Sequence, residues 1–285
     1  MKVLIVGAGG QLGRTLADTA PEEVALQRLD LPDCDITDEN SVRRHVGAAA
    51  PDFIVNAAAY TAVDRAESEA ELAFAVNAAG AGHLARAALE TGARLVHVST
   101  DYVFDGGANT PYAPEAECRP LGVYGRSKRQ GEIAVLEILA DALILRTAWL
   151  YSRHGANFVG TMLRLMAAKP QLSVVADQVG APTWAGTLAA AIWAAARRPA
   201  LKGIYHWTDA GVASWYDFAV AIQEEALALG KLARPIPILP IRTADYPTAA
   251  RRPAYSVLDC ARAWRDFHLA PIHWREALRR MLREL

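Results

Sequence analysis

Tyr124 and Lys128 lie four positions apart in the stretch Val123-Tyr-Gly-Arg-Ser-Lys128. On a helix, side chains at positions i and i+4 lie on the same face, one turn apart. We expect the ammonium group to favour the phenolate and so to lower a tyrosine pKa that is about 10 when unperturbed. A phenol of that kind can transfer a proton to or from a carbonyl oxygen near neutral pH. Together with a nucleotide-binding turn, this pair suggests hydride transfer.

A glycine-rich turn near the N-terminus follows the first predicted strand and opens the first predicted helix. Gly7 allows a tight turn, and Gly9 or Gly10 lets the backbone approach a pyrophosphate. Gly13 lets the helix pack closely on its strand. The helix N-terminus offers free N–H groups to phosphate. This arrangement predicts a dinucleotide-binding site.

Two side chains near the end of the second predicted strand bear on the choice of dinucleotide. Asp30 ends the strand, where an acidic side chain often binds the ribose 2′-hydroxyl of NAD. Arg28 could instead bind the 2′-phosphate of NADP. As an alternative, Asp30 is a solvated carboxylate in a turn. The sequence therefore leaves NAD and NADP both open.

Polar side chains follow two inner strands of the predicted sheet. Thr100 ends one strand, and open α/β sheets place their ligand contacts at such carboxyl ends. Its hydroxyl could hydrogen-bond the carbonyl oxygen that Tyr124 protonates. Ser99 is the competing hydroxyl, with a buried structural role as its alternative. Asp101 could hold the substrate or begin the next turn.

The segment after the other inner strand carries small residues at positions 57–59. Small side chains would let the chain pass close to a flat cofactor, although plain helix–sheet packing explains them too. Asn77 could bridge this strand to the helix of Tyr124, or it could cap a kink.

Short β-branched runs alternate with Ala- and Leu-rich helical stretches through the first half of the chain. This alternation predicts an α/β fold, with a Rossmann-type doubly wound parallel sheet. We expect a dinucleotide-binding domain over residues 1–150. Residues 151–285 should form mainly a smaller substrate-binding lobe, with some segments returning to the main domain. The predicted strands are 3–6, 25–29, 53–56, 94–99 and 142–146, and the predicted helices are 13–19, 38–49, 69–91, 124–140, 157–168 and 187–197.

Prolines accumulate between Pro235 and Pro253, which favours irregular chain or an edge strand there. The 285 residues are 52% hydrophobic and 21% charged, with a formal net charge of −1. That balance gives no reason to expect nucleic acid or an anionic membrane as a partner. The three cysteines form no disulfide framework or zinc motif, which suggests a reducing, cytoplasmic location. The seven histidines show no metal-binding spacing, so no metal is expected.

Several blocks of the sequence resemble the dTDP-4-dehydrorhamnose reductase family, within the extended short-chain dehydrogenase/reductase superfamily. These blocks span almost the entire chain in the expected order. They are residues 7–13, 56–64, 99–106, 124–128, 146–151, 177–183 and 252–256.

The resemblance implies that NADPH, or NADH, delivers hydride to C4 of dTDP-4-dehydro-β-L-rhamnose. Tyr124 would protonate the developing alkoxide. Lys128 would lower the tyrosine pKa and bind the nicotinamide ribose, and Thr100 would orient the carbonyl. The expected cofactor-binding residues are Gly7, Gly10, Gln11, Leu12, Asp30, Asp35, Ile36, Ala59, Tyr60, Thr61, Tyr124 and Lys128. The expected substrate-binding residues are Val63, Thr100, Asp101, Trp149 and Arg252.

Other interpretations remain open for some of these residues. Trp149 follows an apolar strand and could be a core aromatic, while Trp207 and Trp215 have a weaker claim to ligand contact. Arg252, beside another arginine, could belong to a solvated charge pair. His206 is interpreted as a structural histidine of the lobe.

Some relatives hold magnesium across a dimer with glutamates, the first just after the last glycine of the turn. Arg14 and Thr15 occupy that stretch here, so we expect a monomer rather than a magnesium-bridged dimer. The rival functions are another nucleotide-sugar reductase, an epimerase or dehydratase, and a non-catalytic NADP-binding regulatory subunit. Asp101 is followed by Tyr102 rather than glutamate, which argues against dehydration.

Overall fold

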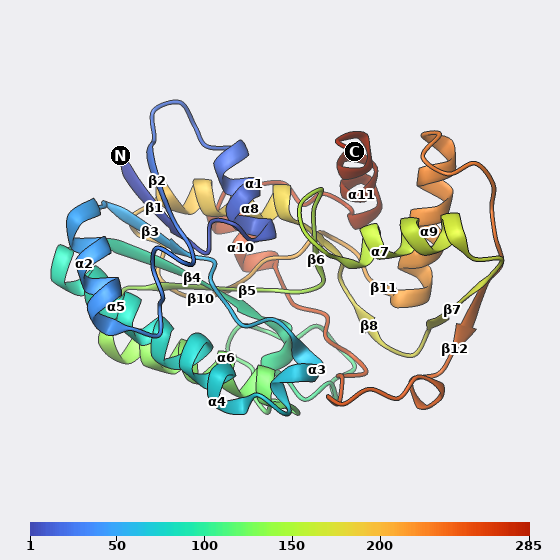
Figure 1. The fold of residues 1–285 in the computed structure, drawn as a ribbon, viewed down its shortest axis with the longest axis horizontal. Coiled ribbons are helices and arrows are strands. Elements are labelled where there is room, and N and C mark those ends of the chain that lie inside the picture. Colours follow the sequence, from blue (N-terminus) through green and yellow to red (C-terminus); the bar gives the residue numbers. More distant parts are fainter.

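A six-stranded parallel sheet forms the centre of the computed structural model, which covers residues 1–285 (Figure 1). The strand order is β10-β5-β4-β3-β1-β2. The chain places β2 on one side of β1 and then adds β3, β4, β5 and β10 on the other side, so the order of the strands reverses between β1 and β3. Such a reversal is the place where open α/β sheets bind ligands. The strands are β1 (Lys2–Val6), β2 (Ala25–Leu29), β3 (Phe53–Asn56), β4 (Arg94–Thr100), β5 (Leu143–Thr147) and β10 (Gly203–His206).

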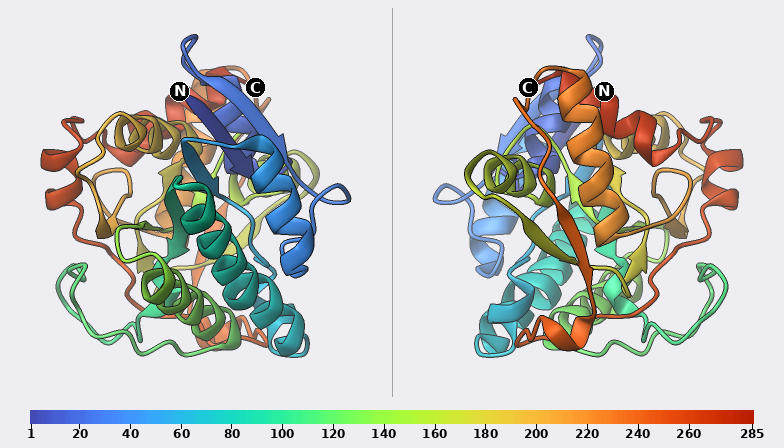
Figure 2. Two further views of the ribbon diagram at one scale, coloured as in Figure 1. Left: turned by 90° about the vertical axis from the view of Figure 1, so that its left-hand side faces the viewer. Right: turned by 90° about the vertical axis from the view of Figure 1, so that its right-hand side faces the viewer.

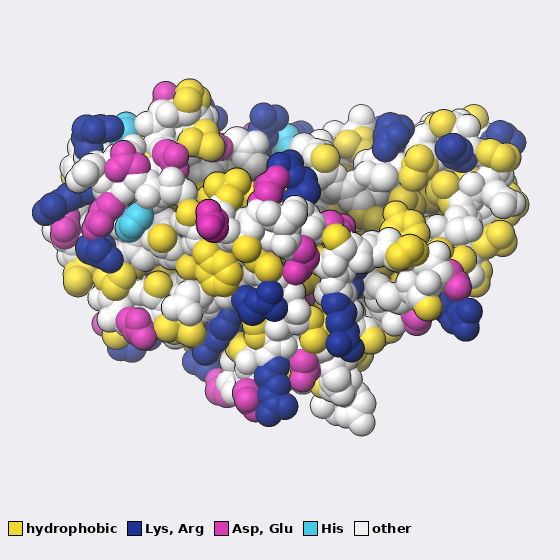
Figure 3. Space-filling view, turned by 60° about the horizontal axis from the view of Figure 1, so that its bottom comes forward, with side chains coloured by type: hydrophobic (Ala, Val, Ile, Leu, Met, Phe, Trp, Pro, Cys, Tyr) yellow, Lys and Arg dark blue, Asp and Glu magenta, His cyan; other side chains and the backbone are white.

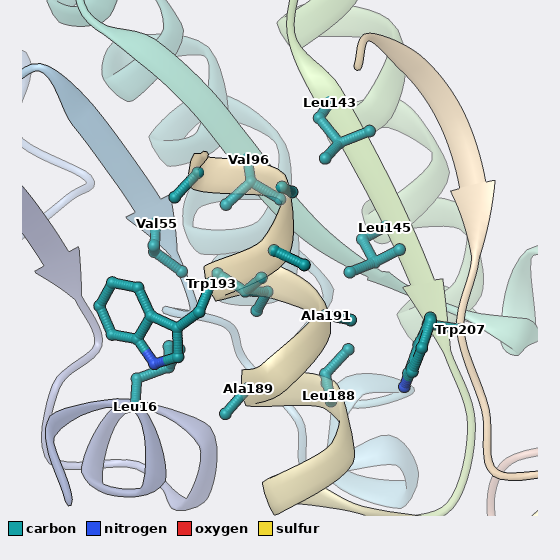
Figure 4. Close-up of a cluster of buried hydrophobic side chains, with 14 of the residues drawn as sticks. Leu16, Val55, Val96, Leu143, Leu145, Leu188, Ala189, Ala191, Trp193 and Trp207 are labelled. Carbon is teal, nitrogen blue, oxygen red and sulfur yellow. The ribbon is translucent and has the colours of Figure 1, made fainter. Parts of the chain in front are cut away.

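Helices cover both faces of this sheet, which explains why its inner strands are continuously apolar. One face carries α2 (Glu39–Ala49), α5 (Gly80–Thr91) and α6 (Val123–Ile138), which lie side by side in the left view of Figure 2. The other face carries α1 (Gln11–Asp18), α8 (Ala185–Ala196) and α10 (Ala261–Asp266). Figure 4 shows α8 placing Leu188 and Ala191 toward strand residues that include Leu145.

A second, smaller core lies in the later part of the chain, to the right in Figure 1. It is built around Phe218, Ile222 and Trp274, all buried. None of the helices is both long and apolar enough to cross a membrane. The elements that contribute to this part are α7 (Phe158–Ala168), α9 (Trp215–Ala228), α11 (Trp274–Arg283), β7 (Leu172–Val175) and β12 (Ile238–Ile241). Two short strand pairs complete it, β6 (Leu150–Tyr151) with β9 (Thr183–Trp184) and β8 (Val179–Gly180) with β11 (Ala213–Ser214).

The predicted α/β sheet is confirmed, and most element ranges agree with the prediction to within two residues. Asp38 caps α2 as expected, since its side chain accepts a hydrogen bond from the backbone N–H of Asn40. The proline-rich stretch contains β12, which pairs only with β7 and so is an edge strand. The sixth strand, β10, was not predicted; because it lies in the main sheet, His206 belongs to that sheet rather than to the lobe.

The long helix predicted over residues 69–91 is interrupted. A five-residue π-helical turn, Ala75–Ala79, separates α4 (Ala70–Phe74) from α5. Such wide turns occur mostly at functional sites. Here the turn directs the carbonyl and the amide of Asn77 toward α6.

Two glycines let α6 lie very close to neighbouring backbone. A Cβ at Gly131 would overlap the Asn77 carbonyl oxygen, and one at Gly125 would overlap the carbonyl oxygen of Tyr102. Only glycine permits this approach, because any other residue would push the helix outward. The position of Tyr124 and Lys128 over the end of β4 therefore depends on these glycines.

We expect Gly131→Ala to lower the free energy of unfolding by about 1–3 kcal/mol, because the added methyl group overpacks α6 against backbone. Urea unfolding monitored by circular dichroism would measure the change. Gly82→Ala on α5 is the matched control, since its Cβ would lie 3.6 Å from Ala134, an ordinary contact. That variant should be unchanged or slightly more stable, given the higher helix propensity of alanine. Equal behaviour of the two variants would contradict the close-packing argument.

Candidate active site

The structure brings Thr100, Tyr124 and Lys128 together at the carboxyl end of β4. Thr100 ends the strand, and α6 carries the other two side chains on the face that packs against it. The Lys128 ammonium is almost fully buried and donates to the Val98 carbonyl oxygen at 2.7 Å. The ring of Tyr102 packs edge-on against Tyr124, with centroids 5.5 Å apart.

The prediction that Lys128 lowers the pKa of Tyr124 is wrong, because that pKa is raised. Burial raises the pKa of Tyr124 to about 12, a hydrogen bond with Thr100 lowers it in part, and the charge of Asp101 raises it further. Desolvation outweighs any help from the lysine, whose proton points to the strand backbone. Tyr124 is therefore protonated at neutral pH, the state that a proton donor needs at the start of a reduction.

Asp101 lies next to Thr100 and is 2% exposed. Its Oδ1 accepts a hydrogen bond from the Thr100 hydroxyl at 3.0 Å, while its Oδ2 has no close hydrogen-bond partner in the protein. Burial raises the pKa of this carboxyl group to about 6, although the neighbouring hydroxyl groups of Ser256 and Thr100 oppose that shift. A buried oxygen without a partner costs free energy, so it favours a ligand that donates to it. Ser99, the competing hydroxyl, lies buried beside Glu132.

Asn77 connects the loop after β3 to the helix of the tyrosine. Its amide oxygen accepts from the Tyr60 N–H at 2.8 Å, and its amide nitrogen donates to the Tyr60 carbonyl and the Ser127 hydroxyl, both at 3.0 Å. The bridging interpretation of Asn77 is confirmed, because all of these bonds join the loop to α6. The π-helical turn that contains Asn77 has no side-chain cap, so the capping interpretation is wrong. Tyr60 is thereby fixed beside α6.

A cleft of about 210 Å³ lies at the carboxyl ends of β1, β2 and β3. A Cβ at Gly7 would lie 2.5 Å from the Ala58 nitrogen, and the backbone φ there is +81°, so this position requires glycine. The cleft also includes Cys34 and Val76, which no pattern in the sequence marks as functional. The expected cofactor residues that line it are Gly7, Gly10, Asp30, Asp35, Ile36 and Ala59.

The remaining expected cofactor residues lie outside this cleft. The Leu12 side chain is buried in the core beneath the turn, and Thr61 is exposed. The Gln11 amide oxygen accepts from Ser152 at 3.2 Å and from Asn157 at 3.1 Å, both in the loop after β6. That loop therefore closes onto the glycine turn.

Trp149 packs against the smaller core and also against a buried cluster that includes Phe104. Its backbone has a φ of +46°, which is unusual for a residue other than glycine. Its ring stacks on Trp215 with centroids 3.5 Å apart and an angle of 7°, and a Cβ at Gly180 would lie 2.6 Å from it. Strained backbone held by packing on both sides is typical of functional positions.

A second cleft, of about 430 Å³, lies between α7 and β7 and is mostly apolar. Phe158 and Trp215 form part of its wall, and Arg252 lies at its edge. Trp215 thus lines a cleft, whereas Trp207 is buried in the main core. The face drawn in Figure 3 is hollowed between the main body and the smaller part at the right, and hydrophobic side chains gather there.

Arg252 forms a two-pronged ion pair with Asp64, at 2.7 and 3.1 Å. Asp64 follows Val63 in the short helix α3 (Val63–Ala66), so this pair ties the loop after β3 to the C-terminal part of the chain. Arg252 is therefore not a freely solvated charge, in contrast to its exposed neighbour Arg251.

His206 has no place in the chemistry. It is 1% exposed, and its ring lies 3.1 Å from the Tyr112 carbonyl oxygen and 3.3 Å from the Arg146 guanidinium. Burial, assisted by the charge of Arg146, lowers the pKa of His206 to about 3. It is a neutral structural residue, as predicted.

Comparison with known proteins agrees with this geometry. A family model described as the RmlD substrate binding domain matches residues 1–285. A dTDP-4-dehydrorhamnose reductase of Aggregatibacter actinomycetemcomitans is 44% identical, covering 98% of this chain and 97% of the relative. A probable dTDP-4,6-dihydroxy-2-methyloxan-3-one 4-ketoreductase of Streptomyces antibioticus is 47% identical, covering 98% and 94%. The crystal structure of Bacillus anthracis dTDP-4-dehydrorhamnose reductase with NADP has a TM-score of 0.94 at 38% identity, covering 100% of this chain and 99% of that one.

The doubly wound sheet, the glycine turn and the grouped threonine, tyrosine and lysine define an oxidoreductase of the extended short-chain dehydrogenase/reductase class, which uses a nicotinamide dinucleotide. The full-length matches narrow this class further. The chain belongs to the dTDP-4-dehydrorhamnose reductase family.

Burial lowers the pKa of Lys128 to about 8, which predicts a pH limit on activity. The ammonium form exists below that pKa, so kcat/KM should fall as the pH rises through about 8. Initial rates between pH 6.5 and 9.5 would measure the profile. In Lys128→Met the residual activity should lack this limb. A wild-type profile that stays flat to pH 9.5 would show that the charge of Lys128 is not needed.

Proposed function

We propose that this protein reduces the C4 ketone of dTDP-4-dehydro-β-L-rhamnose with NADPH, giving dTDP-β-L-rhamnose. The observation that carries this proposal is the protonated Tyr124 beside Thr100 and Lys128, next to a turn that only glycine can form. The full-length similarity to dTDP-4-dehydrorhamnose reductases supports the choice of sugar.

The residues around the first cleft fit a dinucleotide, because α1 begins at the glycine turn and points its N-terminus there. Gly7 lets this turn lie directly against the backbone of Ala58 in the loop after β3. NADPH supplies the hydride for C4 of the sugar. Tyr124 donates its proton to the C4 oxygen as negative charge develops on it. The Thr100 hydroxyl turns its single proton from Asp101 Oδ1 to the same oxygen and holds that oxygen beside the phenol. Lys128 binds the nicotinamide ribose and compensates the phenolate that remains.

The sugar and its diphosphate would lie between Thr100 and the second cleft. The free Oδ2 of Asp101 accepts a hydrogen bond from a sugar hydroxyl. Trp149 and Val63 form apolar walls around the ring. Arg252 binds the diphosphate, and its pairing with Asp64 holds the guanidinium in position until the substrate arrives.

The same C4 ketone reduction would serve the sugar named for the Streptomyces antibioticus relative. An epimerase and a non-catalytic NADP-binding regulatory subunit are the competing functions. We propose a monomer that needs no magnesium, because Arg14 is exposed and Thr15 donates to the Gln11 carbonyl oxygen where some relatives carry a glutamate. Residues 1–150 would bind the dinucleotide, and residues 151–285 would mainly bind the nucleotide sugar.

The purified protein should oxidise NADPH, measured at 340 nm, with dTDP-4-dehydro-β-L-rhamnose and no added divalent metal. Tyr124→Phe should keep cofactor binding but lose roughly 10²–10⁴-fold in kcat, because the proton donor is gone. Tyr216→Phe is the matched control, since it removes a hydroxyl from α9, away from α6. Near-normal turnover by Tyr124→Phe would disprove the proton-donor role, and NADPH binding without turnover by the wild type would favour the regulatory subunit.

Arg252→Ala should raise the substrate KM by roughly tenfold or more with a smaller change in kcat, because charged hydrogen bonds to the diphosphate are lost. Arg251→Ala removes the same charge from an exposed neighbour and should leave KM nearly unchanged. Steady-state kinetics at saturating NADPH would separate the two parameters. If both variants raise KM equally, Arg252 contributes only its positive charge to the electrostatic potential of the surface and does not bind the diphosphate directly.

A further inference from the structure

The first turn of α6, which carries Tyr124, is held from outside the helix by one carboxylate. Glu67 ends the short helix α3, and its Oε1 accepts a hydrogen bond from the Val123 N–H at 2.7 Å. Val123 is the first residue of α6, so its N–H is one of the four that a helix cannot satisfy internally. A negative charge at this end also interacts favourably with the helix dipole. The carboxylate therefore fixes the residue next to the proposed proton donor.

Gly122, the residue before α6, leaves room for this carboxylate. It has no side chain with which to cap the helix itself. A Cβ at this position would lie 2.6 Å from Glu67 Oε1 and would otherwise meet only the rest of the same carboxyl group. The backbone φ of −122° is open to any residue, so the conformation does not require glycine. The missing Cβ at Gly122 thus serves the approach of Glu67.

An apolar contact holds the same two segments together. Ala66, the last residue of α3, is fully buried and forms a small core with Val123 and Ala73. The side chains of Tyr60 and Tyr124 pack against this core. The backbone of α3 is thereby held beside the start of α6, within reach of the Glu67 side chain.

The same short helix also holds the arginine that is proposed to bind the diphosphate. Asp64 accepts from the Arg252 guanidinium at 2.7 Å and from the Ala250 N–H at 3.1 Å. The four residues of α3 thus connect the segment of Arg252 to the helix of Tyr124. In the proposed complex, one of these side chains binds the diphosphate and the other meets the ketone of the sugar. Their separation decides whether the ketone oxygen lies within hydrogen-bond distance of the phenol, which proton transfer requires.

We propose that Glu67 is a positioning residue for the reduction: through the Val123 N–H it fixes the start of α6 against α3, so that Tyr124 meets the C4 oxygen of a substrate bound at Arg252. This proposal rests on the proposed reductase function for the reaction that it serves. Glu67 acts through the helix and not on the reacting atoms. Its loss should therefore slow the chemical step and leave the binding of both ligands almost unchanged.

Four variants and a control test this hydrogen bond. Glu67→Ala removes the acceptor, whereas Glu67→Gln keeps an oxygen that can accept from the same N–H. Gly122→Ala keeps Glu67 and displaces its carboxylate with a methyl group. The double variant Glu67→Ala/Gly122→Ala has the methyl group but no carboxylate to displace. Glu71→Ala is the matched control, because it removes an exposed carboxylate from the first turn of α4.

We expect kcat to fall roughly tenfold to a hundredfold in Glu67→Ala and in Gly122→Ala, since a small misplacement of a reacting group has an effect of that size. The KM values for NADPH and for the sugar should change by less than about threefold. Glu67→Gln and Glu71→Ala should keep kcat within about threefold of the wild type. The double variant should be no slower than Glu67→Ala, because both changes remove the same hydrogen bond.

Hydrogen exchange of the backbone gives a second measurement, which needs no substrate. The Val123 N–H should exchange faster in Glu67→Ala and in Gly122→Ala than in the wild type, because its acceptor is lost or displaced. Mass spectrometry of peptides that contain Val123 would measure this rate. Binding of NADP⁺ with near-normal affinity would show that each variant is folded.

Four results would overturn the positioning role. They are a near-normal kcat in Glu67→Ala, a loss confined to KM, a Glu67→Gln variant as slow as Glu67→Ala, and a double variant in which the two losses multiply. Unchanged exchange of Val123 in Glu67→Ala would also contradict it, whatever the substrate is. A wild type that oxidises no NADPH with the sugar would instead disprove the proposed function, so the two proposals fail separately.

Discussion

The contact of α6 with the backbone of two neighbouring segments is the constraint on which the active site depends. Gly125 and Gly131 leave no Cβ between the helix and the carbonyl groups of Tyr102 and Asn77. A helix one methyl group farther out would carry its phenol away from the end of β4. The positions of the reactive groups therefore depend on two residues without a side chain, because the missing Cβ atoms let α6 pack directly on the neighbouring backbone.

Burial sets the chemistry of the groups that this contact brings together. The tyrosine keeps its proton, the lysine holds its proton less firmly than in water, and Asp101 holds its proton more firmly. Each shift disfavours the charged form, so a ligand that brings compensating charge or hydrogen bonds gains affinity there. The buried pair of Glu132 and Arg146 shows the contrasting case, in which two charges at 2.8 Å compensate each other and no group is left for a ligand.

The sequence predicted most of the fold because strand and helix signals are local. Short β-branched runs located β1 to β5, and the glycine spacing located the dinucleotide turn. What it missed depends on distant partners: the pairing of Arg252 with Asp64 spans 188 positions, and the stacking of Trp149 on Trp215 joins separate elements. The direction of the pKa shift of Tyr124 was also missed, because spacing gives the distance to a charge but not the loss of water around it. The strand β10 was missed because its four residues carry no periodic pattern of their own.

The loop after β6 has a consequence for how such enzymes can diversify. Its Ser152 and Asn157 hold Gln11 of the glycine turn, and Asn157 also caps α7, a wall of the apolar cleft. One amide thus serves both binding regions, so they are not independent modules. A chimera that exchanges the later part of the chain for that of a relative must keep the hydrogen bonds between this loop and Gln11. Otherwise a change in sugar preference will also change the affinity for the cofactor.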